Sequence, residues 1–252
     1  MLELYHSHIS TCSQKVRLCL AEKGIEDWVS RPIDLSRREN LRPEFLAINP
    51  NGVVPAFVHG GRAVYESTVM CEYLEEVFPR GARLSPEDAI DRALMRAWLR
   101  WIDEVPSMAV RVPSFQKVFL PAFQAMSPAD FKQFAEANPL RKDFFTRMGQ
   151  TGFSDQEYAI ALERLDRSLQ RMEAALGTGP WLLGAQFTIA DVCLIPVVTR
   201  LEDLGMADLW LGRYEHVAGW YARAQARPSY ARAFYPGTRI SHQRPGYAAL
   251  AV

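Results

Sequence analysis

The fold of this chain is decided by the stretch Asn49-Pro50-Asn51-Gly52-Val53-Val54-Pro55. Its first four residues have turn composition, and the Val-Pro pair leads into the apolar run Ala56–Val58, which predicts a strand. A proline at a strand entry cannot donate a ladder hydrogen bond, so the position requires a sheet edge or a special geometry such as a cis peptide. Taken alone, the dipeptide favours an ordinary trans proline, because only about 5–6% of X-Pro bonds in folded proteins are cis.

Short strands and helices alternate on both sides of this stretch. Before it, the patterns predict strands at 2–5 and 28–33, a helix at 10–23 that ends at Gly24, and a helical turn at 43–48. After it, they predict strands at 56–58 and 62–65 around Gly60-Gly61, followed by a helix at 66–77. The sequence therefore predicts a small α/β domain at residues 1–80.

The remainder of the chain has helical periodicity. A linker rich in proline and glycine follows Phe78, and helices are predicted at 91–103, 155–176, 189–204 and 216–226. The segment 112–152 is rich in Phe, Pro and Met and is not assigned. We expect a second, all-helical domain at residues 88–252.

The composition excludes several classes of protein. The 252 residues are 48% hydrophobic, enough for a sizeable core, and 29 Lys plus Arg balance 29 Asp plus Glu. Bulk charge therefore recruits neither nucleic acid nor an anionic membrane. No window approaches the ~20 apolar residues of a bilayer span, and the N-terminus lacks a signal-peptide pattern. We expect a soluble, cytoplasmic protein.

The cysteines give no sign of a disulfide framework or a metal site. Cys12, Cys19, Cys71 and Cys193 stand far apart, with no CxxC motif and no clustered histidines. Free thiols and no bound metal are the expectation.

Glu66-Ser67-Thr68 can open a helix shortly after the Val-Pro pair. The Ser67 hydroxyl and the free N–H groups of a helix start suit a carboxylate, while Glu66 suits an ammonium. The zwitterionic end of an amino acid fits this combination. The alternative is that Ser67 merely caps its own helix.

The stretch Ser10-Thr11-Cys12-Ser13 lies between a predicted strand and a predicted helix. Hydroxyls and a thiol at a helix N-terminus can stabilise a bound thiolate through hydrogen bonds and the helix dipole. Cys12 would also ionise more readily there, which makes it a candidate nucleophile. Helix capping by Ser10 is the alternative, and it is compatible with thiolate stabilisation.

Phe187-Thr188-Ile189-Ala190-Asp191 has the pattern of a capping box, in which Thr188 and Asp191 each satisfy a backbone donor. This is a folding signal. Asp191 begins an otherwise apolar helix, so it needs the partner that the cap supplies.

These motifs together resemble the cytosolic glutathione transferases across nearly the whole chain. The resemblance rests on Ser10-Thr11-Cys12-Ser13-Gln14-Lys15-Val16-Arg17, the stretch 49–55, Glu66-Ser67 and Phe187–Asp191. It implies an α/β thioredoxin-like N-terminal domain, an all-α C-terminal domain, a cis peptide at Val54-Pro55 and a homodimer. It also implies an enzyme that uses glutathione as co-substrate against a hydrophobic aromatic electrophile.

The resemblance also assigns contacts to glutathione. Glu66 and Ser67 would hold its γ-glutamyl end, and the backbone of Val54, before Pro55, would pair with its cysteinyl part. Asn40 falls near a position that contacts the glycyl end. The residue before the Val-Pro pair is often Lys or Gln in the family and is a valine here, so a polar contact is missing or supplied elsewhere.

Two branches of the family compete for the catalytic residue. Ser10 aligns with the catalytic serine of theta-like and zeta-like classes, and Ser10 with Cys12 is similar to the pair of glutathione-dependent reductive dehalogenases. In those, the cysteine resolves a glutathionyl intermediate. The stretches 64–79 and 92–104 are instead similar to bacterial β-aryl etherases of lignin catabolism, in which the serine aligns with Ser13. We favour the etherase interpretation and leave the choice among Ser10, Cys12 and Ser13 open.

An apolar, aromatic acceptor pocket is expected beside the thiolate. The candidates come from the first loop and the helical domain: His8, Ile9, Trp101, Met108, Phe115, Phe119 and Phe123. Each could equally be core. The aromatic, proline-broken segment 112–123 suits a loop better than a regular helix. His6 and His8 are weaker candidates for a proton donor, because a structural role is commoner.

Two interpretations from other functional classes remain, because fold does not fix function. One is a binding or assembly module without turnover, and the other is a carrier of hydrophobic ligands.

Overall fold

The computed structural model describes residues 1–243 of the chain, so the last nine residues of the expected helical domain lie outside the described part. The N-terminal part forms a four-stranded sheet of order β2-β1-β3-β4. Strand β1 (Leu2–His6) runs parallel to β2 (Trp28–Pro32) and antiparallel to β3 (Ala56–His59), which pairs with β4 (Arg62–Tyr65). The predicted strands are confirmed to within one residue or two at each end.

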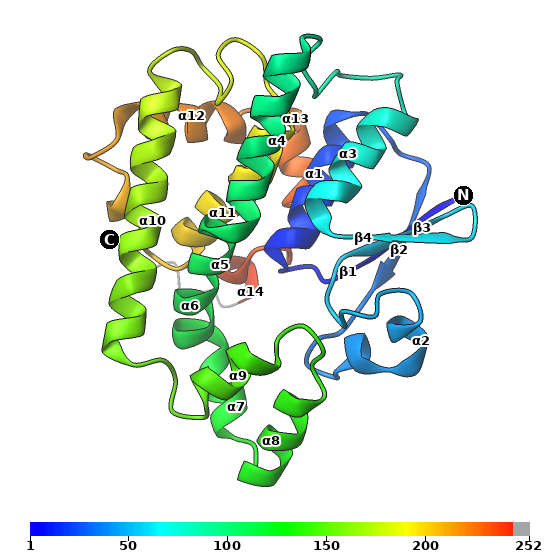
Figure 1. Cartoon of the computed structure of the whole chain (residues 1–252), viewed down its shortest axis with the longest axis vertical. Coiled ribbons are helices and arrows are strands. Elements are labelled where there is room, and N and C mark those ends of the chain that lie inside the picture. Colours follow the sequence, from blue (N-terminus) through cyan, green and yellow to red (C-terminus); the bar gives the residue numbers. More distant parts are fainter. Residues whose placement is uncertain (244–252) are drawn as a thin grey trace.

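Helices cover this sheet because its strands carry apolar residues on both faces. Helices α1 (Thr11–Glu22) and α3 (Ser67–Val77) share one core cluster with β1 and β3 (Figure 1). The short helix α2 (Pro43–Leu46) follows the 3₁₀ turn Glu39–Leu41 and packs Phe45 against Val54 and Ala56 in a separate cluster. The thioredoxin-like domain of the sequence prediction is confirmed.

The second domain is helical, as predicted. Its long helices are α4 (Ala89–Glu104), α10 (Asp155–Leu176), α11 (Ile189–Asp203) and α12 (Glu215–Gln225). Its shorter ones are α5 (Pro106–Ala109), α6 (Arg111–Ser114), α7 (Leu120–Gln124), α8 (Pro128–Glu136), α9 (Lys142–Met148), α13 (Pro228–Ala233) and α14 (Ile240–Gln243), with a π-helical turn at Phe115–Phe119 and a 3₁₀ turn at Ala207–Leu209.

Helix α11 is the centre of this domain. Almost all of its side chains are buried, and it contacts α1 of the first domain as well as α4. The predicted capping box is present: Thr188 N–H donates to Asp191 Oδ2 at 2.9 Å. Leu182 N–H and Trp220 Nε1–H donate to the other oxygen at 3.0 and 2.9 Å, so buried Asp191 has the partners that it requires.

The expectation of a loop at 112–123 is wrong, because this segment is helical throughout. Pro113 and Pro121 fall in the first turns of α6 and α7, where a missing N–H costs no intrahelical hydrogen bond. The phenylalanines of 112–153 other than Phe119 form a second core cluster of their own, in which Phe115, Phe123 and Phe145 make ring contacts.

This Phe-rich part reaches back to the first domain. The Arg38 guanidinium lies over the Phe134 ring at 5.2 Å from its centroid. Gly52, at φ +61°, sits so close to α8's exit that an added Cβ would meet Pro139 Cδ at 3.1 Å. Helices α8 and α9 therefore approach the loop that precedes Val54-Pro55. No helix among residues 1–243 is both long and apolar enough to cross a membrane.

Candidate active site at the start of the first helix

The start of α1 carries the predicted hydroxyl and thiol groups. Ser10 has extended backbone and is the N-cap: its Oγ accepts from Ser13 N–H at 3.3 Å. Ser10 and Cys12 are partly exposed, whereas Ser13 is fully buried. The Ser13 Oγ accepts from Ser7 N–H at 3.3 Å, which ties it to the loop after β1. Of the three candidates, only Ser10 and Cys12 reach the surface.

A buried polar network fixes the loop that leads into this helix. Arg17 donates to His6 Nδ1 at 3.1 Å and to His8 O at 2.8 Å. His6 therefore carries its proton on Nε2, where it donates to Ser30 Oγ at 2.8 Å. Burial, with the charge of Arg17, lowers the pKa of His6 to about 3, so this ring is neutral and structural.

His8 lies at the surface of the same loop. Its Nδ1 pairs with the Tyr235 hydroxyl at 2.8 Å, and burial with the charge of Arg17 lowers its pKa below the usual value. Tyr235 follows α13, so the end of the helical domain holds this side of the loop.

Glu66 and Ser67 lie at the start of α3, as predicted. Glu66 is a non-glycine residue at φ 70°, a conformation that costs about 1–3 kcal/mol and that persists where the surroundings enforce it. Its carboxylate accepts from Asn51 Nδ2 at 3.1 Å, and Ser67 is buried as the first residue of the helix. Sequence analysis missed the positioning role of Asn51, which turn composition alone does not reveal.

The Val54-Pro55 peptide is cis, so that prediction is confirmed. Val54 is buried against Phe45 and Ala56. The Asn40 side chain lies near this loop, where its Nδ2 donates to Gly52 O at 2.7 Å. Its amide nitrogen is thus used to hold the loop before the Val-Pro pair.

Four cations lie near Cys12, two of them buried and two partly buried, and sequence analysis missed all of them in this role. Lys15, Arg111, Arg141 and Arg200 each interact electrostatically with the Cys12 thiol. They come from α1, α6, the N-cap of α9 and α11. Because these positions have no common spacing along the chain, no sequence pattern announces them. Together they place positive potential where a thiolate at the helix start would lie.

The proposed acceptor residues fall into different places. Ile9 and Phe119 pack against the main core, and Phe115 lies in the second cluster with Phe119 and Phe123 as ring neighbours. Met108 is 45% exposed on α5.

Trp101 is not brought to the helix start. It packs edge-on against Trp98, and the Arg171 guanidinium lies 4.3 Å from its ring centroid. Two residues along a helix are about 200° apart, so Trp101 faces away from Asp103, which contacts Lys15 of α1.

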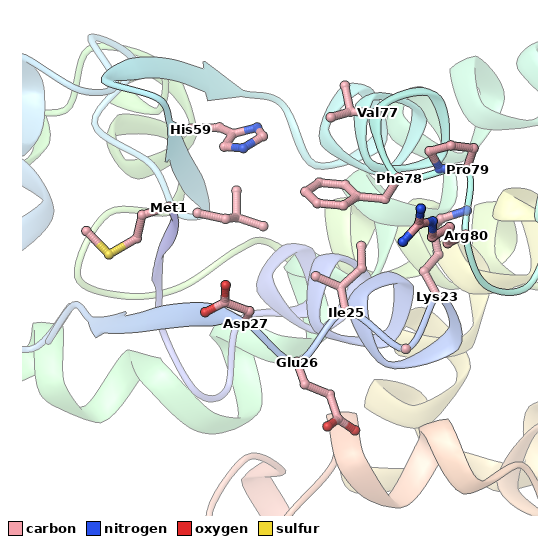
Figure 2. A pocket seen from close by; sticks show the side chains of 12 residues that line it. Met1, Lys23, Ile25, Glu26, Asp27, His59, Val77, Phe78, Pro79 and Arg80 are labelled. Atoms are coloured by element: carbon pink, nitrogen blue, oxygen red, sulfur yellow. The ribbon is translucent and has the colours of Figure 1, made fainter.

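A surface hollow of about 630 Å³ lies elsewhere, between the exit of α1 and the exit of α3. Figure 2 shows His59 and Phe78 on one side of it and Ile25 and Asp27 on the other. The His59 and Phe78 rings stack at 5.6 Å between centroids. Helix α1 rises about 18 Å over its twelve residues, so this hollow is at the opposite end from Ser10 and Cys12.

The structure combines a thioredoxin-like sheet and a cis proline with an appended helical domain. A hydroxyl and a thiol stand at the start of its first helix. These features together define a class of proteins that act on a small thiol. The family model for the glutathione S-transferase N-terminal domain matches residues 4–83, and that for the C-terminal domain matches 155–223. The chain belongs to the glutathione S-transferase family, whose members are enzymes.

Relatives of the chain include two bacterial proteins of named activity. Protein LigF of Sphingobium sp. strain SYK-6 is 31% identical over 94% of this chain and 95% of its own. The crystal structure of LigF, described as a β-etherase, covers 92% of this chain and 98% of its own with a TM-score of 0.85. The tetrachloro-p-hydroquinone reductive dehalogenase of Sphingobium chlorophenolicum is 26% identical over 91% of this chain and 94% of its own.

Proposed function

We propose that this glutathione transferase cleaves β-aryl ethers of the kind found in lignin-derived aromatics. The observation that carries the proposal is the likeness to the β-etherase LigF in both sequence and fold, at 31% identity and a TM-score of 0.85. The structural likeness covers 92% of the chain. The Phe-rich cluster of residues 112–153 supplies the apolar surface for the acceptor in this proposal.

Glutathione binds along the loop before β3 and the start of α3 in this proposal. Glu66 and Ser67 take the γ-glutamyl ammonium and carboxylate, because a carboxylate and the N–H groups of a helix start face those charges. The Val54 backbone, before cis Pro55, pairs with the cysteinyl part. Asn40 donates one side-chain N–H to Gly52 O, and its second N–H is the donor that would reach the glycyl carboxylate.

The thiol of glutathione then lies at the start of α1. Ser10 donates its hydroxyl to the sulfur while its lone pair still caps Ser13 N–H. The helix dipole and the buried cations near Cys12 favour the thiolate over the thiol. Ser13, buried and bonded to Ser7, holds the loop.

The thiolate attacks the carbon that lies between the ketone and the ether oxygen. The new carbon–sulfur bond forms as the carbon–oxygen bond breaks, and the electron pair leaves with a phenoxide that takes a proton from water. Holding both reactants in line supplies much of the rate. Glutathione remains attached to the ketone as a thioether.

A second candidate is glutathione-dependent reductive dehalogenation or thiol–disulfide exchange through Cys12. It is favoured by the partial exposure of Cys12 at the helix start and by the 26% identical dehalogenase. In that scheme the Cys12 thiolate attacks a glutathionyl sulfur and forms a mixed disulfide. The sulfur–carbon bond breaks in dehalogenation, where the aromatic product takes up a proton, and the sulfur–sulfur bond breaks in exchange, where a thiolate leaves. A second glutathione then releases Cys12 and forms oxidised glutathione.

The protein acts as a cytoplasmic homodimer in this proposal. The four described cysteines are free thiols, which suits a reducing compartment. Val69 of α3 and Ile90 and Leu94 of α4 are 50–71% exposed, on helices that are joined by the Arg96–Glu72 ion pair. Such an apolar patch suits an interface, and sedimentation equilibrium measures the oligomeric state.

The test is incubation with glutathione and a β-aryl ether ketone, or with a halogenated hydroquinone, with products followed by mass. Release of the phenol with a glutathione thioether supports the etherase. Dehalogenation with oxidised glutathione, lost in Cys12→Ala, supports the second candidate. No turnover of either substrate overturns both and favours a binding module.

A further inference from the structure

Three arginines of the helical domain lie near Cys12, one of them buried and the other two partly buried. Arg111, Arg141 and Arg200 make no ion pair with any residue in the described part of the chain. The Nε atoms of Arg141 and Arg200 are buried and have no hydrogen-bond partner there. Arg200 is only 5% exposed. Arg141 interacts electrostatically with Glu66 and Arg200 with Asp203, but neither carboxylate forms an ion pair with its arginine. Buried charges are normally paired closely, so this arrangement calls for an anion.

The remaining contacts of these arginines show how they are held. Arg200 donates to Ile9 O and to Ser114 Oγ, the latter at 3.3 Å, which fixes it under the loop before Ser10. The Arg111 guanidinium lies 5.7 Å from the centroid of Phe144. Arg141 is the N-cap of α9, where a cation opposes the helix dipole, so helix stability does not explain its place.

Contacts between their elements bring the three arginines near one another: Arg200 bonds to the helix that carries Arg111, and Arg111 lies over a ring of the helix that Arg141 caps. Arg111 and Arg141 repel each other electrostatically, and each of the three interacts with Cys12. Burial lowers the pKa of Arg141 to about 9, with Arg111 adding to the shift, and burial lowers that of Arg200 to about 10. All three stay charged at neutral pH, so the positive charge is permanent.

Glutathione does not account for this charge. Arg141 interacts electrostatically with Glu66, one of the residues proposed to hold glutathione, but Arg111 and Arg200 show no such interaction. Its thiolate supplies one negative charge near the start of α1, where Lys15 also stands. A phenoxide leaving group would neutralise the positive charge of the arginines only during the reaction. A substrate with a permanent anion neutralises it as soon as the substrate binds.

We propose that Arg111, Arg141 and Arg200 form an oxyanion site for the second substrate, so that the preferred acceptor is an aromatic molecule that carries a permanent anion such as a carboxylate. Phe144, beneath Arg111, and Phe115, whose ring lies 4.9 Å from that of Phe144, give an apolar surface for the aromatic part. The inference rests on the proposed function and specifies its acceptor.

The test measures equilibrium binding to the full chain, first of S-methylglutathione and then, with that analogue saturating, of 4-methoxybenzoate and its uncharged methyl ester. We expect the carboxylate to bind about tenfold or more tightly than the ester, since a charged hydrogen bond is worth roughly 1.5–3 kcal/mol. Arg111→Gln and Arg141→Gln should each remove most of this preference and leave ester binding unchanged.

Arg147→Gln is the matched control. Arg147 lies in α9, the helix that Arg141 caps, but it forms an ion pair with Glu157 at 3.0 Å. The variant should keep the full preference. Equal binding of the carboxylate and the ester to the wild type overturns the inference, even if the variants fail to fold. A preference seen only without S-methylglutathione also overturns it, since the arginines would then serve glutathione.

Failure of the proposed function gives a different result. In that case S-methylglutathione does not bind, while the preference for the carboxylate is still measurable on the free protein.

Discussion

The Lys15 ammonium of α1 donates to the Asp103 carboxylate of α4 at 2.9 Å, and this ion pair joins the two domains beside the candidate site. The Lys15 side chain is fully buried, and Asp103 also accepts from the Thr68 hydroxyl of α3 at 2.6 Å. Burial disfavours the charged ammonium, but the negative groups around it, Cys12 and Asp103 first, raise the pKa of Lys15 above its usual value. Three helices thus meet at Asp103.

Asp103→Asn should destabilise the protein by about 1–2 kcal/mol, because it removes the negative partner of the buried Lys15 ammonium, while the 40% exposure of Asp103 and the Lys15–Ser107 hydrogen bond reduce the loss. Urea unfolding measures the change. Glu104→Gln on the same helix is the control: its pair with Arg100 is exposed on both sides, so the change should stay within about 0.5 kcal/mol. Equal effects of the two substitutions would contradict a structural role for the Lys15 pair.

Ser10→Ala should lower turnover of the ether about 10- to 100-fold, the worth of a hydrogen bond to a charged group. It should also cost about 1 kcal/mol of stability through the lost cap. Ser13→Ala should have a smaller effect on turnover, because its hydroxyl is buried against Ser7. Unchanged turnover in both variants would remove the assignment of the thiolate to these serines.

Cys12→Ala should retain β-ether cleavage within about tenfold, or ~1.4 kcal/mol of barrier, because no step of that reaction uses the thiol. The measurement is the rate at which the glutathione thioether forms. Complete loss of thioether in the folded variant would show that Cys12 is essential and would move the assignment to the second candidate.

His6→Gln should make stability less sensitive to acid. The folded protein holds the pKa of His6 at about 3, whereas the unfolded chain has its usual 6.5, so the unfolded state binds more protons between these values. The contribution of His6 to the free energy of unfolding is fully present above pH 6.5. Below pH 6.5 it falls by about 1.4 kcal/mol per pH unit, so that roughly 2 kcal/mol is lost at pH 5. Glutamine can accept from Arg17 and donate to Ser30 without titrating.

Urea unfolding at pH 7 and pH 5 measures the His6 effect. The wild type should lose more unfolding free energy over this interval than the variant. An identical loss in both proteins would mean that His6 takes up a proton in the folded state.

Much of the fold follows from local patterns. The strands, α1 and α3, the helical second domain and the Thr188–Asp191 box are set by alternation, turn residues and caps, which act over a few residues. The helices at 112–124 do not follow from the sequence, because a proline inside a helix normally interrupts it. Pro113 and Pro121 stand in the first turns of their helices, where a proline is tolerated. Whether a proline falls in the first turn depends on where the helix begins, and a run of aromatic residues does not show that starting point.

The residues of the candidate site likewise fall into those that local sequence predicts and those that it does not. Ser10, Cys12, Glu66 and Ser67 were identified because each stands at a helix start. The arginines around Cys12 were not, because tertiary packing brings together residues that lie tens of positions apart. The contact between Trp101 and the Arg171 guanidinium, which belongs to a helix about 70 residues further on, was not predictable for the same reason.

The central claim is that the start of α1 ionises the thiol of bound glutathione. It is tested most directly by pH titration of the ultraviolet absorbance of the thiolate in the enzyme–glutathione complex, in a Cys12→Ala background with the glutathione-free protein subtracted. The account predicts that the bound thiol ionises at a lower pH than free glutathione and that Ser10→Ala shifts the titration back toward the free value. A bound thiol that titrates at the same pH as free glutathione would contradict the account.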